Sequence, residues 1–174
     1  MRTEIRIAGF GGQGIVLAGL LLGEAAIHEG KRAVQTQSYG PESRGGAARS
    51  EVVISNQEIN YPKVVEADIL VALSQAAFDK YRPFVKENSI IIIDEDLVKA
   101  EEDKIYSVPF TRIADALGKK VVANSVMLGY LLASTEVISV ESMKATIREK
   151  VPEDTVDLNL KAFNRGIKLW NRGK

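Results

Sequence analysis

A glycine-rich loop near the N-terminus is the first segment whose residue types and spacing could do chemistry. Gly9-Phe10-Gly11-Gly12-Gln13-Gly14 fits the pattern G-x-G-x-x-G. Glycines let the backbone turn tightly and let a ligand or another chain approach closely. The free amides at the start of a following helix favour an anion such as a phosphate. The pattern therefore predicts an anion-binding turn, and the alternative is that these glycines serve strand-to-helix packing alone.

A second unusual segment, Ser38 to Gly46, places an aromatic ring, a carboxylate, a guanidinium and three glycines within nine residues. Arg44 could pair with a phosphate or carboxylate of a ligand or of a partner subunit. Tyr39 and Glu42 are expected at a protein interface rather than in catalysis, since aromatic residues are enriched at protein contacts although glutamate is not. The candidate binding residues of the two loops are Gly9, Gly11, Gly12, Gln13, Gly14, Arg44, Gly45 and Gly46.

Several catalytic and cofactor classes are excluded or weakened by missing residue types. The sequence contains no cysteine and one histidine, His28. It can therefore hold no disulfide, no thiolate-bound iron–sulfur cluster and no His-rich metal site, and we predict no catalytic residue in this chain. The second strand ends in Gln35-Thr36-Gln37-Ser38 without the acid that would bind the ribose of a dinucleotide. No Gly-Lys-Ser/Thr follows the glycines, so a P-loop is excluded as well.

Composition limits the partners of the protein. Its 174 residues include 23 basic and 23 acidic side chains, so the formal net charge is zero and no overall basic field gathers nucleic acid or membrane. The apolar runs are too short to span a bilayer. The N-terminus runs directly into a strand-like segment, which leaves no room for a signal peptide. We therefore expect a cytoplasmic protein.

The elements that position the two loops alternate between strand and helix. This alternation predicts a single domain over residues 1–174, with a three-layer α/β/α fold around a mostly parallel, Rossmann-like sheet. If the first two strands are adjacent, the two loops are neighbours at the edge where such sheets bind ligands. The predicted strands cover residues 4–8, 32–37, 50–55, 67–72, 89–93 and 104–108, and the predicted helices cover 15–29, 75–85, 111–117, 124–134, 142–150 and 156–171.

Two helical features carry further expectations. Asn124 and Ser125 are expected to cap the helix that follows them, because both residue types accept hydrogen bonds from free helix amides. In the last helix Phe163, Ile167 and Trp170 fall on one stripe, which favours packing onto the domain or a partner. Gly166 costs about 1 kcal/mol of helix propensity within that helix. Tertiary or quaternary packing should therefore stabilise this end of the chain.

Taken in order along the chain, the motifs resemble the gamma subunits of 2-oxoacid:ferredoxin oxidoreductases, and residues 35–49 most resemble the 2-oxoglutarate branch. The matching segments are residues 9–14, residues 37–46 without Ser43, residues 68–73 and residues 123–129. The resemblance implies a subunit that is inactive alone, in a complex that converts a 2-oxoacid and coenzyme A to acyl-CoA and carbon dioxide and reduces ferredoxin. It implies alpha-, beta- and delta-type partners that carry thiamine diphosphate, magnesium and iron–sulfur clusters.

For this chain the resemblance implies subunit docking and a share in coenzyme A binding, with the ligand contacting Gly11 to Gly14 and Arg44. The alternative is a stand-alone regulatory domain that binds a nucleotide or phosphometabolite. A dinucleotide-dependent dehydrogenase is a third possibility, which the missing acid after the second strand disfavours.

Overall fold

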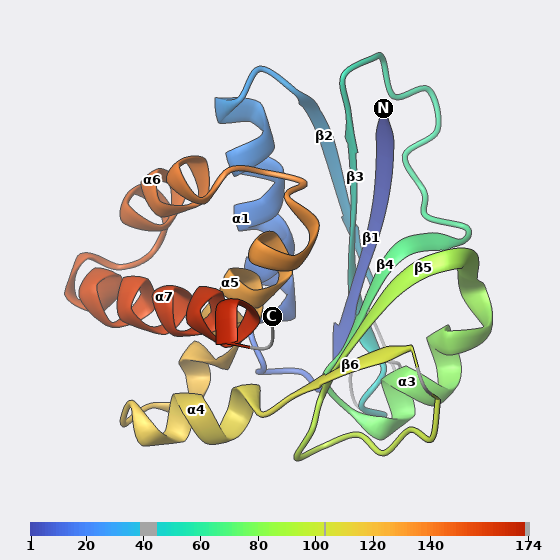
Figure 1. Cartoon of the computed structure of the whole chain (residues 1–174). Helices are drawn as coiled ribbons and strands as arrows, with labels where there is room; N and C mark the ends of the chain where they lie inside the picture. The colour runs from blue at the N-terminus through green and yellow to red at the C-terminus, as the bar shows by residue number, and fades with distance from the viewer. Residues whose placement is uncertain (39–44, 103, 173–174) are drawn as a thin grey trace.

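The central sheet of the protein has six strands in the order β2-β3-β1-β4-β5-β6, as the computed structural model shows (Figure 1). The structure describes residues 1–38, 45–102 and 104–172. Near-continuous apolar sequence forms β4 and β5, whose core residues are almost fully buried, as expected for strands covered on both faces. The strands are β1 (Arg2–Gly9), β2 (Arg32–Gln37), β3 (Ala48–Ser55), β4 (Ala67–Ala72), β5 (Val85–Asp94) and β6 (Ile105–Val108).

Strand direction confirms the predicted mostly parallel α/β sheet and adds one exception. The strands β1, β4, β5 and β6 run parallel to one another, each paired with the next in that order. The strand β3 runs antiparallel to both β1 and β2 and lies between them. The condition that the first two strands are adjacent is therefore not met.

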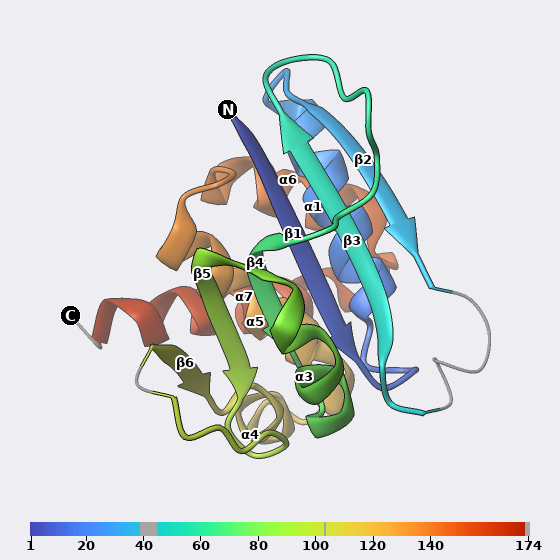
Figure 2. The same ribbon diagram turned by 90° about the vertical axis from the view of Figure 1, so that its right-hand side faces the viewer.

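Helices cover the two faces of the sheet unequally. Four of them, α1, α5, α6 and α7, lie together on one side of the sheet in Figure 1, and α3 lies on the other. Figure 2 shows that the connection between β3 and β4 passes over the same face as α3. The helices are α1 (Ile15–His28), α3 (Gln75–Tyr81), α4 (Phe110–Ala116), α5 (Ala123–Thr135), α6 (Val140–Lys150) and α7 (Val156–Arg172).

The helix predicted over residues 75–85 is shorter than expected. It ends at Tyr81, and a single 3-10 turn, Arg82–Phe84, leads directly into β5. Pro83 explains the early end, because proline has no backbone N–H to continue the helical ladder. The strand that follows is longer than expected, since β5 begins at Val85 rather than at the predicted Ser89.

Close backbone contact between α5 and α7 explains the glycine in the last helix. A Cβ atom on Gly166 would overlap the carbonyl oxygen of Val126, and one on Gly129 would overlap that of Phe163. Phe163 is fully buried, and the Trp170 ring lies 5.7 Å from the ring of Tyr130. The expectation that packing stabilises this end is confirmed. None of the helices in the described ranges is long and apolar enough to cross a membrane.

Candidate functional site

The glycine loop between β1 and α1 is held in shape by its own glutamine. Gly12 and Gly14 adopt left-handed backbone angles, with φ of 90° and 73°. Gln13 Oε1 accepts a hydrogen bond from the Phe10 amide at 2.6 Å, and Gln13 Nε2 donates to the Leu73 carbonyl at 2.9 Å. The Gln13 side chain therefore fixes the loop to the residue that follows β4.

Asn124 holds the end of the same loop from the other side. Its Nδ2 lies 3.4 Å from the Gly14 carbonyl, and a Cβ atom on Gly14 would come within 2.5 Å of that nitrogen. The helix α5 begins at Ala123, so the prediction that Asn124 and Ser125 cap it is wrong, although Asn124 Oδ1 does accept the Ser125 amide at 2.8 Å. Ser125 Oγ instead donates to Asn159 of α7 at 2.7 Å. These long-range contacts leave no signal in local spacing.

The described end of the second predicted loop meets the first loop, but through β3 rather than through adjacent first and second strands. Because β3 is antiparallel, it begins where β1 ends, and Ala48 lies opposite Gly9. A Cβ atom on Gly46 would come within 2.5 Å of the Phe10 ring. Gly45 is exposed at this edge. The other predicted residues of the second loop, Tyr39, Glu42 and Arg44, lie outside the described residues.

A cleft of about 280 Å³ opens beside the glycine loop, at the carboxyl edge of the parallel strands. This is the edge where open α/β sheets bind ligands. Two predicted binding residues, Gly12 and Gln13, line it. Leu73 and Ala123 belong to the segments 68–73 and 123–129 noted in the sequence, but neither they nor the other lining residues were predicted to bind a ligand. The remaining lining residues are Leu73, Asp94, Leu97, Thr111, Lys120, Val121 and Ala123.

Asp94 shapes the floor of this cleft. It is the last residue of β5 and is 1% exposed. Its Oδ2 accepts the Thr111 hydroxyl at 2.6 Å and the Thr111 amide at 3.0 Å, and its Oδ1 accepts the Asp96 amide at 3.0 Å. Burial of a carboxylate is tolerated when such donors satisfy it. Through these hydrogen bonds Asp94 joins the end of β5 to the start of α4.

The cleft offers donors and positive charge to an anion. Among the described residues, no group accepts a hydrogen bond from the amides of Gly11, Gly12 or Gly14. The first turn of α1 carries no acidic side chain, so the positive end of the helix dipole is not neutralised locally. Lys120 is exposed at the mouth of the cleft. Its ammonium group forms no ion pair within the described ranges, which leaves it available to a ligand.

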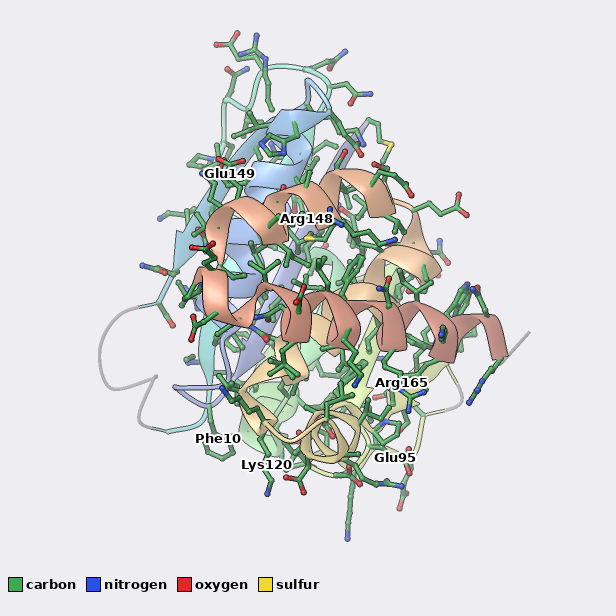
Figure 3. The ribbon with its side chains drawn as sticks, turned by 90° about the vertical axis from the view of Figure 1, so that its left-hand side faces the viewer. Phe10, Glu95, Lys120, Arg148, Glu149 and Arg165 are labelled. Atoms are coloured by element: carbon green, nitrogen blue, oxygen red, sulfur yellow. The ribbon has the colours of Figure 1, made fainter. Side chains whose placement is uncertain are left out.

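Large exposed apolar side chains lie in the cleft lining, at Val121, and on the glycine loop beside it, at Phe10. Phe10 is 49% exposed and Val121 is 60% exposed. Figure 3 shows Phe10 and Lys120 at the same end of the molecule. Large exposed apolar groups around a pocket indicate a surface that another molecule covers. This edge is therefore suited to hold an anion and to dock a partner at the same time.

His28 lies far from this edge, at the opposite end of α1. Its Nδ1 is 3.2 Å from the Thr146 hydroxyl, and its Nε2 is 3.3 Å from a Glu149 carboxylate oxygen. The ring therefore joins α1 to α6. In the part of the chain that the structure describes, no group of three or more acidic or histidine side chains is placed to hold a metal ion.

The comparisons with known proteins agree on one family. The family model described as pyruvate ferredoxin/flavodoxin oxidoreductase matches residues 4–169. The 2-oxoglutarate synthase subunit KorC of Methanocaldococcus jannaschii is 52% identical over 97% of this chain and 94% of its own length. A solved keto/oxoacid ferredoxin oxidoreductase gamma subunit from Geobacter sulfurreducens PCA is 42% identical, with a TM-score of 0.87, over 98% of this chain and 99% of its own.

A larger solved protein shares the fold alone. It is the 2-oxoglutarate:ferredoxin oxidoreductase of Magnetococcus marinus, solved with 2-oxoglutarate, coenzyme A and succinyl-CoA bound. It is 23% identical to this chain, with a TM-score of 0.86, over 98% of this chain and 31% of its own length.

Proposed function

Since this chain belongs to the pyruvate ferredoxin/flavodoxin oxidoreductase family, we propose that it serves a complex acting on 2-oxoglutarate and that its glycine-loop cleft receives part of coenzyme A. The chain is a gamma subunit of a 2-oxoacid:ferredoxin oxidoreductase, which decarboxylates a 2-oxoacid to acyl-CoA and reduces ferredoxin. The choice of 2-oxoglutarate is supported by the 52% identity to KorC over nearly the full length of both chains.

The division of labour in the complex is part of the proposal. We assign thiamine diphosphate, magnesium and the iron–sulfur clusters to alpha-, beta- and delta-type companion chains, and place the complex in the cytoplasm. The sequence of this chain supplies no cysteine to bind a cluster through thiolates. Its own tasks are then to dock on the companions and to hold the anionic part of coenzyme A, which supplies the thiol that accepts the acyl group.

The combination of free amides and Lys120 around one cleft carries the coenzyme A proposal. Amides at the start of a helix bind phosphate groups, and an ammonium group strengthens that binding through charge-assisted hydrogen bonds. Gly12 suits this role because no heavy atom beyond its two chain neighbours lies within 4 Å of the position its Cβ would occupy, so this side of its backbone faces open space. The volume of about 280 Å³ suits the pyrophosphate and its neighbours rather than the whole ligand.

The variant Lys120→Ala tests this assignment in the reconstituted complex. We expect the KM for coenzyme A to rise by at least about tenfold, because a hydrogen bond to a charged group contributes roughly 1.5–3 kcal/mol and about 1.4 kcal/mol is a factor of ten. The turnover number at saturating coenzyme A and the KM for 2-oxoglutarate should stay unchanged, because this chain only holds the ligand. Steady-state assays with ferredoxin as the acceptor measure all three quantities.

The matched control is Lys119→Ala, which removes an exposed ammonium group one residue away that does not line the cleft. Arg44→Ala extends the test to the second loop. If Lys120→Ala and Arg44→Ala both left the KM for coenzyme A unchanged, this site would not bind coenzyme A. Tight binding of NAD by the isolated chain in calorimetry would instead favour a nucleotide-binding regulatory domain.

A further inference from the structure

The last helix carries a row of positive charges that the glycine-loop site does not use. Lys161, Arg165, Lys168 and Arg172 are all exposed on α7. Their spacing of four, three and four residues puts them within about 60° of the helix circumference, over about 16 Å of its length. We call these four residues the α7 basic stripe. Neighbouring like charges at such spacings repel each other, so the stripe does not stabilise the helix that carries it.

The stripe is also unusual in its lack of acidic partners. Elsewhere in the described chain exposed cations commonly pair with acids, as in Arg82 with Glu102, Lys86 with Asp68 and Arg112 with Asp96. No ion pair joins any member of the α7 basic stripe to a described acidic residue. The helix dipole favours a cation only in the last turn, which accounts for Arg172 but not for the three others.

An apolar groove runs beside the stripe, between α7 and α4. It has a volume of about 170 Å³ and is lined by Ile113, Ala116 and Leu169 together with three members of the stripe, Arg165, Lys168 and Arg172. Figure 3 shows Arg165 on the side of α7 that faces α4. A small apolar pocket with cations on its rim fits a protein anchor, because interface anchors fill such pockets while charges at the rim select the partner.

We propose that the α7 basic stripe and this groove dock an acidic, amphipathic segment of a companion subunit. Carboxylates of that segment pair with the four cations, and one apolar side chain enters the groove. The inference rests on the proposed function in one respect, that the chain works inside a complex. The surface is separate from the glycine-loop cleft, since the two share no lining residue.

An anionic membrane and a nucleic acid fit this surface less well than an acidic protein segment does. A membrane-surface helix needs an exposed apolar face, whereas Ala162 and Phe163 of α7 are fully buried against the domain. Nucleic-acid grooves combine cations with aromatic rings on which bases stack. The aromatic residue nearest the groove in sequence, Trp170, already makes edge-to-face contacts with Tyr106 and Tyr130, at 5.6 Å and 5.7 Å between ring centroids.

The stripe is presented on a rigid support. Backbone contact at Gly129 and Gly166 locks α7 onto α5, which leaves no room for α7 to shift toward α5. A surface that is already ordered loses little conformational freedom on binding, which strengthens association. The row of cations is therefore ready to receive a partner without rearrangement.

The double variant Arg165→Glu/Lys168→Glu tests the inference in the full chain, expressed together with its companion subunits. We expect the dissociation constant of this chain from its companions to rise about 100-fold, since close interfacial charge pairs contribute strongly to affinity. Raising the salt concentration should weaken the wild-type complex in the same direction. Native mass spectrometry and size-exclusion chromatography report assembly, and circular dichroism checks that the variant is folded.

The matched control is Lys144→Glu/Arg148→Glu, which makes the same charge change on α6, and Figure 3 shows Arg148 there, away from the groove. A second readout is zero-length cross-linking with a carbodiimide. It should join Lys161 or Lys168 to aspartate or glutamate residues of a companion chain.

The outcomes separate the inference from the proposed function. If the wild-type chain did not join any companion, both would be overturned. If the wild type joined and the stripe variant joined with equal affinity, only the inference would be overturned. The same holds if the stripe variant lost binding to single-stranded RNA or to vesicles of anionic phospholipid while its assembly stayed intact.

Discussion

At the scale of single residues, Arg6 shows how this sheet accommodates a charge at its centre. Arg6 lies on the middle strand β1 and is 4% exposed. Its Nε donates to Glu51 of β3 at 2.7 Å, and its guanidinium also donates to the carbonyl oxygens of Val64 at 2.7 Å and Phe84 at 3.1 Å. The ring of Tyr81 lies 5.2 Å from the guanidinium carbon. Arg6 thus links β1 and β3 to two connecting segments, the one between β3 and β4 and the one between α3 and β5.

Removing Glu51, the buried acidic partner of Arg6, should therefore destabilise the fold far more than removing the acidic partner of an exposed pair. We expect Glu51→Gln to lower the free energy of unfolding by about 3–5 kcal/mol, because it leaves the Arg6 charge buried and uncompensated. The control Glu102→Gln breaks an exposed pair with Arg82 and should cost less than about 1 kcal/mol. Urea unfolding of the isolated chain measures both, and equal losses would show that Arg6 does not depend on Glu51.

At the scale of elements, the crossing of α5 and α7 determines the arrangement of the C-terminal half. Gly129 and Gly166 face each other's helix backbone, so the two helices approach more closely than side chains would allow. The α7 basic stripe, the buried Phe163 and the hydrogen bond between Ser125 and Asn159 all depend on this crossing. A position that disfavours helix formation is thus compensated by packing between two helices.

The variant Gly166→Ala tests that balance. Its gain in helix propensity is at most about 1 kcal/mol, whereas overpacking a close contact costs typically about 1–3 kcal/mol or more. We therefore expect a net loss of stability, measured as a lower urea midpoint. The control Gly23→Ala in α1 should be neutral or stabilising, because its Cβ would meet only the Ala33 side chain at 3.9 Å. A stabilised Gly166→Ala protein would contradict the close contact.

At the scale of the whole molecule, Glu29 and Lys31 join the N-terminal β-α-β unit to the C-terminal helices. Glu29 Oε1 accepts the Ser139 amide at 2.6 Å, and Lys31 Nζ donates to Glu29 at 2.8 Å and to the Val137 carbonyl at 2.8 Å. Burial alone would raise the pKa of Glu29. The hydrogen bonds from Lys31 and Ser139 outweigh it and lower the pKa from 4.5 to about 2.

This lowered pKa predicts an acid-sensitive link. The carboxylate of Glu29 stabilises the fold fully at pH values above 4.5, and that contribution is lost as the pH falls toward 2. Glu29→Gln should therefore be less stable than wild type near neutral pH, with a difference that shrinks through this window. Urea unfolding at several pH values checks it. The exposed Glu58→Gln serves as control, and a difference for Glu29→Gln that stayed constant with pH would argue against the link.

The sequence by itself determined the elements of this protein and the chemistry that it lacks. Strand and helix positions follow from local apolar periodicity, so β2 and β4 begin and end where the sequence predicts. The missing cysteines exclude thiolate-bound clusters whatever the fold. The resemblance found in residues 9–14, 37–46 and 123–129 also indicated the family correctly. The roles of Tyr39, Glu42 and Arg44 stay predictions.

Only the tertiary structure decided how these parts combine, because contacts between residues far apart in sequence leave no local pattern. It inserted β3 between β1 and β2 and so brought Gly46 onto Phe10. It fixed the Gln13 side chain within the glycine loop and placed Lys120 and Gly12 in the lining of one cleft. It also set Gly166 against α5, which fixes the direction of the α7 basic stripe. Strand order and helix crossings depend on the packing of the whole chain, and both proposed binding surfaces arise at that level.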